Sequence, residues 1–265
     1  MAHPDDEILW SSSILRRAKK IIICYNQAPG SKAVSIGRVD VFDNFPVENI
    51  ISLNITESDT YLSANWRNPI ETEYGIHCGR NRDGYARNFQ LITSALQDHL
   101  DEGDLVVTHN PWGEYGHEEH VQVFRAVSYV KERKGFRVFV TGYVSDRVVD
   151  FMEKTIDRLR SKPVLMPVDK LLCEDIKRHY QKHNCWTWED DYKWPDYECF
   201  YEVANSGSPL RRNDKTMASL PVNVVWIDGK ISILRRAGRH IKRWFKTSVI
   251  DVFFSAPLLM MVPFH

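Results

Sequence analysis

The residues of this chain that can do chemistry gather in two short stretches. Residues 2–7 contain one histidine and three carboxylates, and His3 and Asp6 are three positions apart. At that spacing both side chains can face one point in a turn or at the start of a helix. Residues 113–120 contain two more histidines, again three positions apart. Imidazole and carboxylate groups are the ligands of catalytic zinc sites, which keep one position open for water.

Each stretch alone has an ordinary interpretation. Residues 2–7 are also typical of an acid-rich helix N-terminus, and many histidine pairs are surface residues. Taken together, two imidazoles, one carboxylate and an open position make a catalytic metal site, whereas a structural zinc site is more often closed by cysteines. These ligands accept zinc or ferrous iron.

The chain around the two stretches alternates between short apolar runs and helical patterns. The runs that predict strands are residues 21–25, 50–53, 105–108 and 137–144. The segments that predict helices are residues 7–20, 34–45, 84–100, 120–134, 150–160 and 169–183. This alternation predicts an α/β fold, a Rossmann-like and mostly parallel sheet flanked by helices. The second stretch follows the run 105–108, and ligands in such sheets bind at the carboxyl ends of strands.

The two motifs in this order, AHPDDE at residues 2–7 and GHEEH at residues 116–120, resemble the zinc-dependent de-N-acetylases of the PIG-L/LmbE family. The resemblance covers about the first half of the chain and, more loosely, the stretch up to residue 203. Members of that family remove acetyl groups from N-acetylglucosamine-type sugars. They usually have an apolar strand directly before the first motif, and this sequence starts at Met1 without one.

The resemblance implies roles for several residues in and beside the two motifs. His3, Asp6 and His120 match the metal ligands, and Asp5 matches the general base. His117 matches a histidine that assists at the oxyanion or the leaving group, and we expect it to be protonated. Tyr115 matches a tyrosine near the carbonyl group, and Glu119 is expected to orient His117.

Substrate contacts are predicted from weaker signals. Arg38, Glu57 and Asp59 fall in a region where the family binds sugar hydroxyls, although solvated surface charges have the same appearance. The stretch 186–201 is rich in aromatic residues, which stack on sugar rings or fill cores. We place Trp112 and Trp188 with Arg38 and Asp59 among the substrate-binding residues.

The amino-acid composition indicates which partners and which cellular setting to expect. The 35 basic and 35 acidic residues balance, which gives no case for nucleic acid binding. The five cysteines form no CxxC pair, which favours free thiols in a reducing, cytoplasmic setting. We expect a deacetylase domain at residues 1–203 and a C-terminal extension at residues 204–265, basic at 230–246 and then apolar at 249–264. The extension either packs on the domain or a second copy in a homo-oligomer, or is a peripheral membrane anchor.

The sequence therefore predicts hydrolysis of the N-acetyl group of an N-acetylated amino sugar. Two alternatives stay open: a metallohydrolase that removes another acyl group, and a carbohydrate-binding relative without catalysis. A nuclease is disfavoured because no basic groove can be identified in the sequence.

Overall fold

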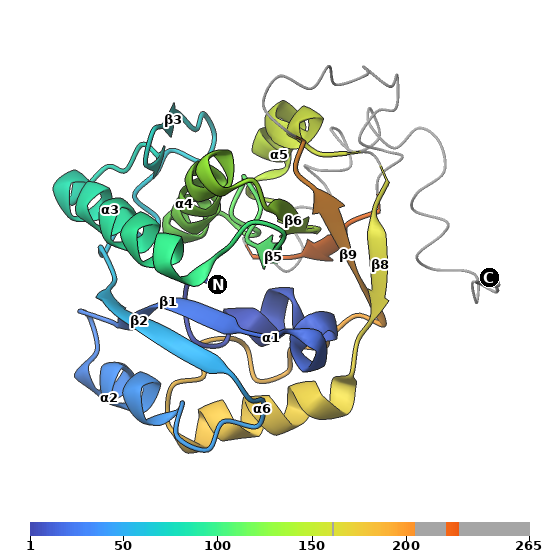
Figure 1. Cartoon of the computed structure of the whole chain (residues 1–265). Helices are drawn as coiled ribbons and strands as arrows, with labels where there is room; N and C mark the ends of the chain where they lie inside the picture. The colour runs from blue at the N-terminus through green and yellow to red at the C-terminus, as the bar shows by residue number, and fades with distance from the viewer. Residues whose placement is uncertain (161, 205–220, 228–265) are drawn as a thin grey trace, which may run out of the picture.

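The computed structural model describes residues 1–160, 162–204 and 221–227 (Figure 1). Parallel strand pairs flanked by helices make up the fold, so the predicted α/β class is confirmed. The predicted basic and apolar parts of the C-terminal extension, residues 230–246 and 249–264, lie outside the described residues. Their packing or membrane association therefore stays a prediction.

An N-terminal βαβ unit supports the first motif. It consists of β1 (Ile21–Gln27), α2 (Lys32–Asp40) and β2 (Ile50–Thr56). The two strands are parallel and lie between α2 on one side and α3 (Arg82–His99) on the other (Figure 1). The carbonyl groups of Met1 and Ala2 accept hydrogen bonds from the N–H groups of Cys24 and Tyr25, at 3.0 and 2.8 Å. The backbone that leads into His3 is therefore fixed along β1.

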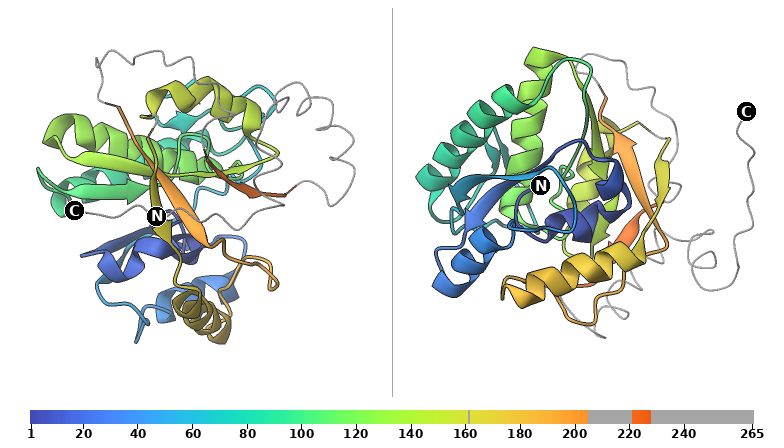
Figure 2. Two further views of the ribbon diagram at one scale, coloured as in Figure 1. Left: turned by 90° about the vertical axis from the view of Figure 1, so that its right-hand side faces the viewer. Right: turned by 60° about the horizontal axis from the view of Figure 1, so that its bottom comes forward.

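A second βαβ unit supports the second motif. It consists of β5 (Leu105–Thr108), α4 (Glu118–Lys134) and β6 (Arg137–Thr141). β5 and β6 are parallel, with Leu105 opposite Arg137, and α3 packs beside α4 (Figure 2). The loop after β5 leads into α4 at the carboxyl end of the strand. This is where the sequence placed the histidines.

Several strands were not predicted. They are β3 (Glu71–Thr72), β4 (Gly75–Ile76), β8 (Val164–Pro167), β9 (Tyr197–Glu202) and β10 (Asn223–Val225). β9 lies antiparallel between β6 and β8 in a sheet of order β5-β6-β9-β8. The predicted strand 137–144 is divided at Gly142 into β6 and β7 (Tyr143–Ser145), and β10 pairs with β7. Residues 223–225 of the predicted extension therefore pack on the main domain.

The predicted helix 7–20 is wrong in its extent. α1 (Asp6–Trp10) ends at Trp10 with Ser11 as its C-cap, and a 3₁₀ helix, η1 (Ser12–Arg17), follows. The buried carboxylate of Glu198 accepts hydrogen bonds from the backbone and hydroxyl groups of Ser12 and Ser13. Because these bonds hold the start of η1 at a separate anchor, the helical pattern breaks there. α6 (Lys170–Lys182) falls within its predicted segment 169–183. α5 (Val149–Thr155) begins just before the predicted segment 150–160 and is followed by a 3₁₀ helix, η2 (Ile156–Arg158).

Two apolar cores enclose the β1–β2 pair. Ile8, Ile21 and Ile23 pack with α6 residues such as Ile176 and Tyr180 on one side. A larger core on the other side joins β1 to α3, α4 and β6. All five cysteines are free and buried, as predicted.

Candidate metal centre and active site

The first motif turns sharply at Asp5, whose φ of 90° lies in the left-handed region. Asp6 begins α1 at the next residue, and its Oδ2 atom lies 3.2 Å from Nδ1 of His3. The side chains of His3, Asp5 and Asp6 are all buried. The turn brings His3 and Asp6 to one point, while Asp5 is held by a different partner.

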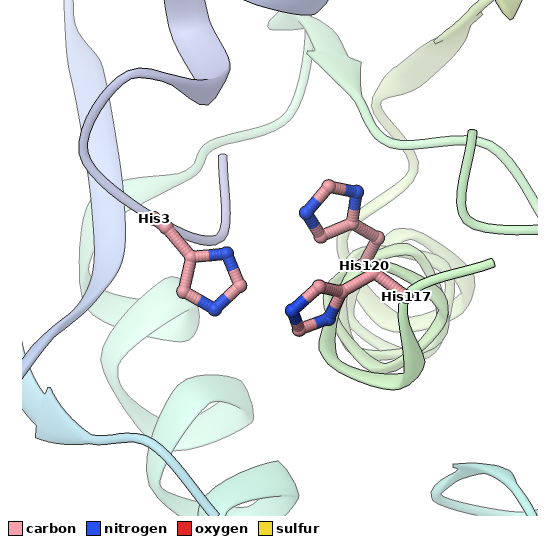
Figure 3. A group of neighbouring side chains, drawn as sticks. All are labelled: His3, His117 and His120. Carbon is pink, nitrogen blue, oxygen red and sulfur yellow. The ribbon is translucent and has the colours of Figure 1, made fainter. Parts of the chain in front are cut away.

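The second motif is a loop with two left-handed glycines, Gly113 and Gly116. A Cβ atom at Gly113 would lie 2.6 Å from the carbonyl oxygen of His117, so only glycine fits there. His117 is the N-cap of α4 and His120 lies in its first turn, with the two rings stacked at 4.6 Å. Figure 3 shows both imidazoles facing His3 across a shared space.

The three predicted metal ligands meet at the Oδ2 atom of Asp6. Nδ1 of His3 and Nε2 of His120 each lie 3.2 Å from it. A tetrahedral zinc ion with bonds of about 2.0–2.1 Å holds its donor atoms about 3.3 Å apart. The Nε2 atom of His120 is buried and has no hydrogen-bond partner in the described part of the chain. This orphaned nitrogen and the spacing of the His3 and His120 donor atoms from Asp6 fit a metal ion held by these three residues.

Three overlapping groups of ligand atoms lie within 4.8 Å of one another among the described residues: His3, His117 and His120; Asp6, His109 and His120; and His3, Glu57 and Glu119. Nε2 of His109 accepts the backbone N–H of Ala2 at 2.8 Å, and its Nδ1 pairs with Oε2 of Glu114 at 2.9 Å. Both nitrogens of His109 are therefore engaged, which argues against His109 as a ligand. Glu114 also pairs with Nδ1 of His120 at 2.8 Å, so Nε2 of His120 keeps its lone pair.

The prediction that Glu119 orients His117 is wrong, because the side chain of Glu119 contacts His3 instead. Its Oε2 lies 2.9 Å from Nε2 of His3, and its Oε1 accepts the hydroxyl of Ser58 at 2.6 Å. Burial alone lowers the pKa of His3, but the hydrogen bonds to Asp6 and Glu119 outweigh it and raise that pKa to about 10. Metal binding at Nδ1 is therefore linked to release of a proton.

His117 and Tyr115 line the space beside these ligands. Nδ1 of His117 accepts the backbone N–H of Glu119 at 3.2 Å, which leaves the ring proton on Nε2. Burial, together with the nearby His120 and His3, holds the pKa of His117 well below its usual range. His117 is thus a neutral donor, which corrects the expectation that it is protonated. Burial and the charge of Asp6 raise the pKa of Tyr115, so its hydroxyl keeps its proton.

The carboxylate of Asp5 is held by Thr187, a residue that the sequence did not single out. Oδ2 of Asp5 accepts the N–H of Thr187 at 2.9 Å and its hydroxyl at 2.7 Å. The other oxygen, Oδ1, is not engaged by Thr187, so it is the atom that could take a proton. Burial and the charge of Asp6 raise the pKa of Asp5 to about 7. A carboxylate with this pKa suits a general base near neutral pH.

His3, Asp5, Asp6, Tyr115 and His117 open into one cavity of about 250 Å³, whereas the fully buried His120 is not part of its lining. It is lined by His3, Asp5, Asp6, Leu9, Arg38, Glu57, Tyr61, Tyr115, His117, Thr187 and Trp188. Arg38 and Trp188, two of the predicted substrate-binding residues, thus line this cavity. Trp112 does not, because it is buried and its indole N–H donates to the carbonyl oxygen of Tyr143 at 2.7 Å. Asp59 is exposed outside the lining and pairs with Arg80 at 3.5 Å.

Thr187→Val is expected to move the acidic limb of the kcat/KM profile to higher pH. The hydrogen bonds of Thr187 lower the pKa of Asp5, and valine removes the hydroxyl donor while keeping the shape. The base must be unprotonated, so activity rises with pH through this pKa. We expect a loss of up to about tenfold at pH 6 and a smaller loss at pH 8. Thr187→Ser keeps the hydroxyl and should behave as wild type, and an unmoved limb in Thr187→Val would contradict the assignment.

Of the comparisons with known proteins, only the one with solved structures found a match. No protein-family model matches the chain, and no curated protein was found to be similar. One solved structure with a similar fold is described as a deacetylase–teicoplanin complex in the biosynthesis pathway of teicoplanin. The two chains are 15% identical, the match covers 78% of this chain and 97% of the other, and the TM-score is 0.47.

The activity in that description belongs to the matched protein. At this identity the likeness says nothing about the substrate of the present chain. None of the helices in the described part of the chain has the length and apolar character needed to cross a bilayer.

Proposed function

We propose that this protein is a metal-dependent hydrolase that removes the acetyl group of an N-acetylated amino sugar, releasing acetate and a free amine. One observation carries the proposal. His3, Asp6 and His120 converge with metal-ligand spacing beside Asp5, and three of these four residues line the same cavity. An N-acetyl group is an amide, a poor electrophile that water attacks slowly, so hydrolysis needs activation of both partners.

Zinc or ferrous iron at this site would supply Lewis acidity, which polarises the carbonyl group and acidifies water. The remaining chemistry belongs to side chains of this chain. Asp5 takes the proton of the attacking water on Oδ1 while Thr187 holds Oδ2. The Nε2–H of His117 and the hydroxyl of Tyr115 donate to the oxyanion of the tetrahedral intermediate. Asp5, now protonated, delivers the proton to the departing amine.

The walls of the cavity support a sugar as the substrate. Arg38 and Glu57 form a hydrogen-bonded ion pair at the lining, and this pair presents a donor and an acceptor to hydroxyl groups. Tyr61 stacks on His117 at 4.7 Å, and Trp188 meets the ring of Tyr115 at 5.0 Å. Such aromatic faces suit the apolar faces of a sugar ring.

The test is acetate release from a panel of N-acetylglucosamine glycosides and lipid-linked N-acetyl sugars by metal-loaded protein. N-propionyl and N-butyryl counterparts address the alternative of another acyl group. Release that disappears in Asp5→Asn supports the proposal. Release from the longer acyl groups alone would overturn the acetyl assignment. No release from any sugar, despite one bound metal per chain and measurable sugar binding, would favour a relative without catalysis.

A further inference from the structure

Glu114 is a buried carboxylate that the chemistry above does not use directly. Its side chain has no exposure to solvent, and its Oε2 atom lies 2.9 Å from Nδ1 of His109 and 2.8 Å from Nδ1 of His120. Its Oε1 atom accepts the backbone N–H of Asn110 at 3.0 Å and the hydroxyl of Thr141. Every contact of the carboxylate is therefore with a hydrogen-bond donor, and two of these donors are imidazoles.

His109 continues this arrangement toward the other half of the site. It is fully buried, and its ring stacks on that of His120 with centroids 3.9 Å apart. With its Nδ1 proton directed to Glu114, its Nε2 atom accepts the backbone N–H of Ala2 at 2.8 Å. Ala2 directly precedes His3 in the sequence. The hydrogen bonds thus run without a break from the backbone before His3, through His109 and Glu114, to the ring of His120.

The backbone at Glu114 supports the same interpretation. Glu114 has a left-handed φ of 51°, which is uncommon for a residue other than glycine. Its N–H donates to Oδ1 of Asn110 at 3.0 Å, and its carbonyl oxygen accepts the N–H of Ser145 at 2.9 Å. Such a conformation persists where the surroundings over-determine it, and this occurs most often at functional sites.

We propose that Glu114 and His109 are positioning residues that set the distance between His3 and His120, two ligands that come from distant parts of the chain. Glu114 orients His120 directly, and His109 fixes the backbone that carries His3. This inference rests on the proposed metal site. It concerns the assembly of that site and not the substrate, so metal binding tests it independently of activity.

Glu114→Gln is the sharpest test. A glutamine amide would place its NH₂ group either against the two histidines at the Oε2 position or against the N–H of Asn110 and the hydroxyl of Thr141 at the Oε1 position. In both orientations the group facing His120 loses its negative charge, which weakens the hydrogen bond that orients this ligand. Loss of a carboxylate behind a ligating histidine typically weakens metal affinity by about 10–100-fold. We expect a loss of this size for zinc, measured by competition with a chromophoric chelator. We also expect a changed visible spectrum of the cobalt-substituted protein, which a purely structural role would not alter.

The matched control is Glu198→Gln. Glu198 is also a buried carboxylate with several donors, Ser12, Ser13 and Tyr143, but none of them is a histidine of the site. This variant should bind zinc as wild type does. Wild-type zinc affinity and an unchanged cobalt spectrum in folded Glu114→Gln would overturn the inference.

If Glu114→Gln does not fold, His109→Phe provides the second variant. Phenylalanine keeps a ring against His120 but removes the hydrogen bonds to Ala2 and Glu114. We expect zinc affinity to fall by about tenfold or more, and wild-type affinity here would overturn the inference. A wild-type protein that binds no metal would refute the proposed function itself.

Discussion

Asp5→Asn is expected to lower kcat by about 10²–10⁴-fold while the protein keeps its metal. Asparagine cannot accept a proton from water, so the general base is lost. The side chain of Asp5 is held by Thr187, whereas the ligand atoms meet at Oδ2 of Asp6. The metal donors should therefore stay in place. Acetate release and metal content measured on the same preparation check both parts of the expectation.

The control for this variant is Asp59→Asn. Asp59 is an exposed aspartate outside the cavity, so its replacement removes a carboxylate without touching the site. We expect wild-type turnover, and a large loss would reinstate Asp59 as a substrate-binding residue. An Asp5→Asn protein with substantial activity would refute Asp5 as the base.

His120→Ala is expected to abolish activity through loss of the metal. His120 offers its orphaned Nε2 atom to the site, and Glu114 holds its other nitrogen. Removing a ligand itself should weaken affinity by more than the roughly 100-fold that loss of a supporting partner can cost. Metal content after gel filtration and zinc affinity by chelator competition provide the measurements.

His117→Ala separates the two interpretations of the histidine cluster. A ligand atom of His117 lies close to those of His3 and His120. The donor atoms of His3 and His120, however, converge on Oδ2 of Asp6. If Asp6 completes the ligand set, His117→Ala keeps its metal and loses turnover. Loss of metal in this variant together with retention in Asp6→Asn would show instead that three histidines form the site.

The sequence predicted the parts of the fold that depend on local pattern. The run Ile21, Ile22 and Ile23 is apolar on both faces, which is typical of a buried strand, and it forms β1. β8 escaped prediction because it is a short edge strand that is mostly exposed and ends at Pro167. The break between α1 and η1 also escaped, since it depends on a carboxylate of β9, Glu198, which is distant in the sequence.

The same distinction holds for the site. Spacing within each motif was enough to bring His3 to Asp6 and His117 to His120. Thr187 was missed because its partner Asp5 is 182 residues away. Glu114 is close in sequence to Asn110, His109 and His120, but these spacings form no recognisable pattern, and the left-handed turn at Glu114 that brings the side chains together was not predicted. Trp112 was wrongly predicted to bind substrate because only its position in the sequence was considered. It neighbours the second motif in sequence, yet the loop turns its indole into the core toward Tyr143.

The contacts that assemble the site join residues very far apart along the chain. The bond from Ala2 to His109 spans 107 residues, that from His3 to Glu119 spans 116, and that from Asp5 to Thr187 spans 182. Closing such long loops comes late and slowly in folding. A metal ion therefore cannot nucleate the folding of this domain as it does that of a zinc finger. It can stabilise only the folded structure, in which its ligands are already assembled. Metal at 100 times its Kd should add about 2.7 kcal/mol to the stability of the whole domain, visible as one cooperative rise in Tm.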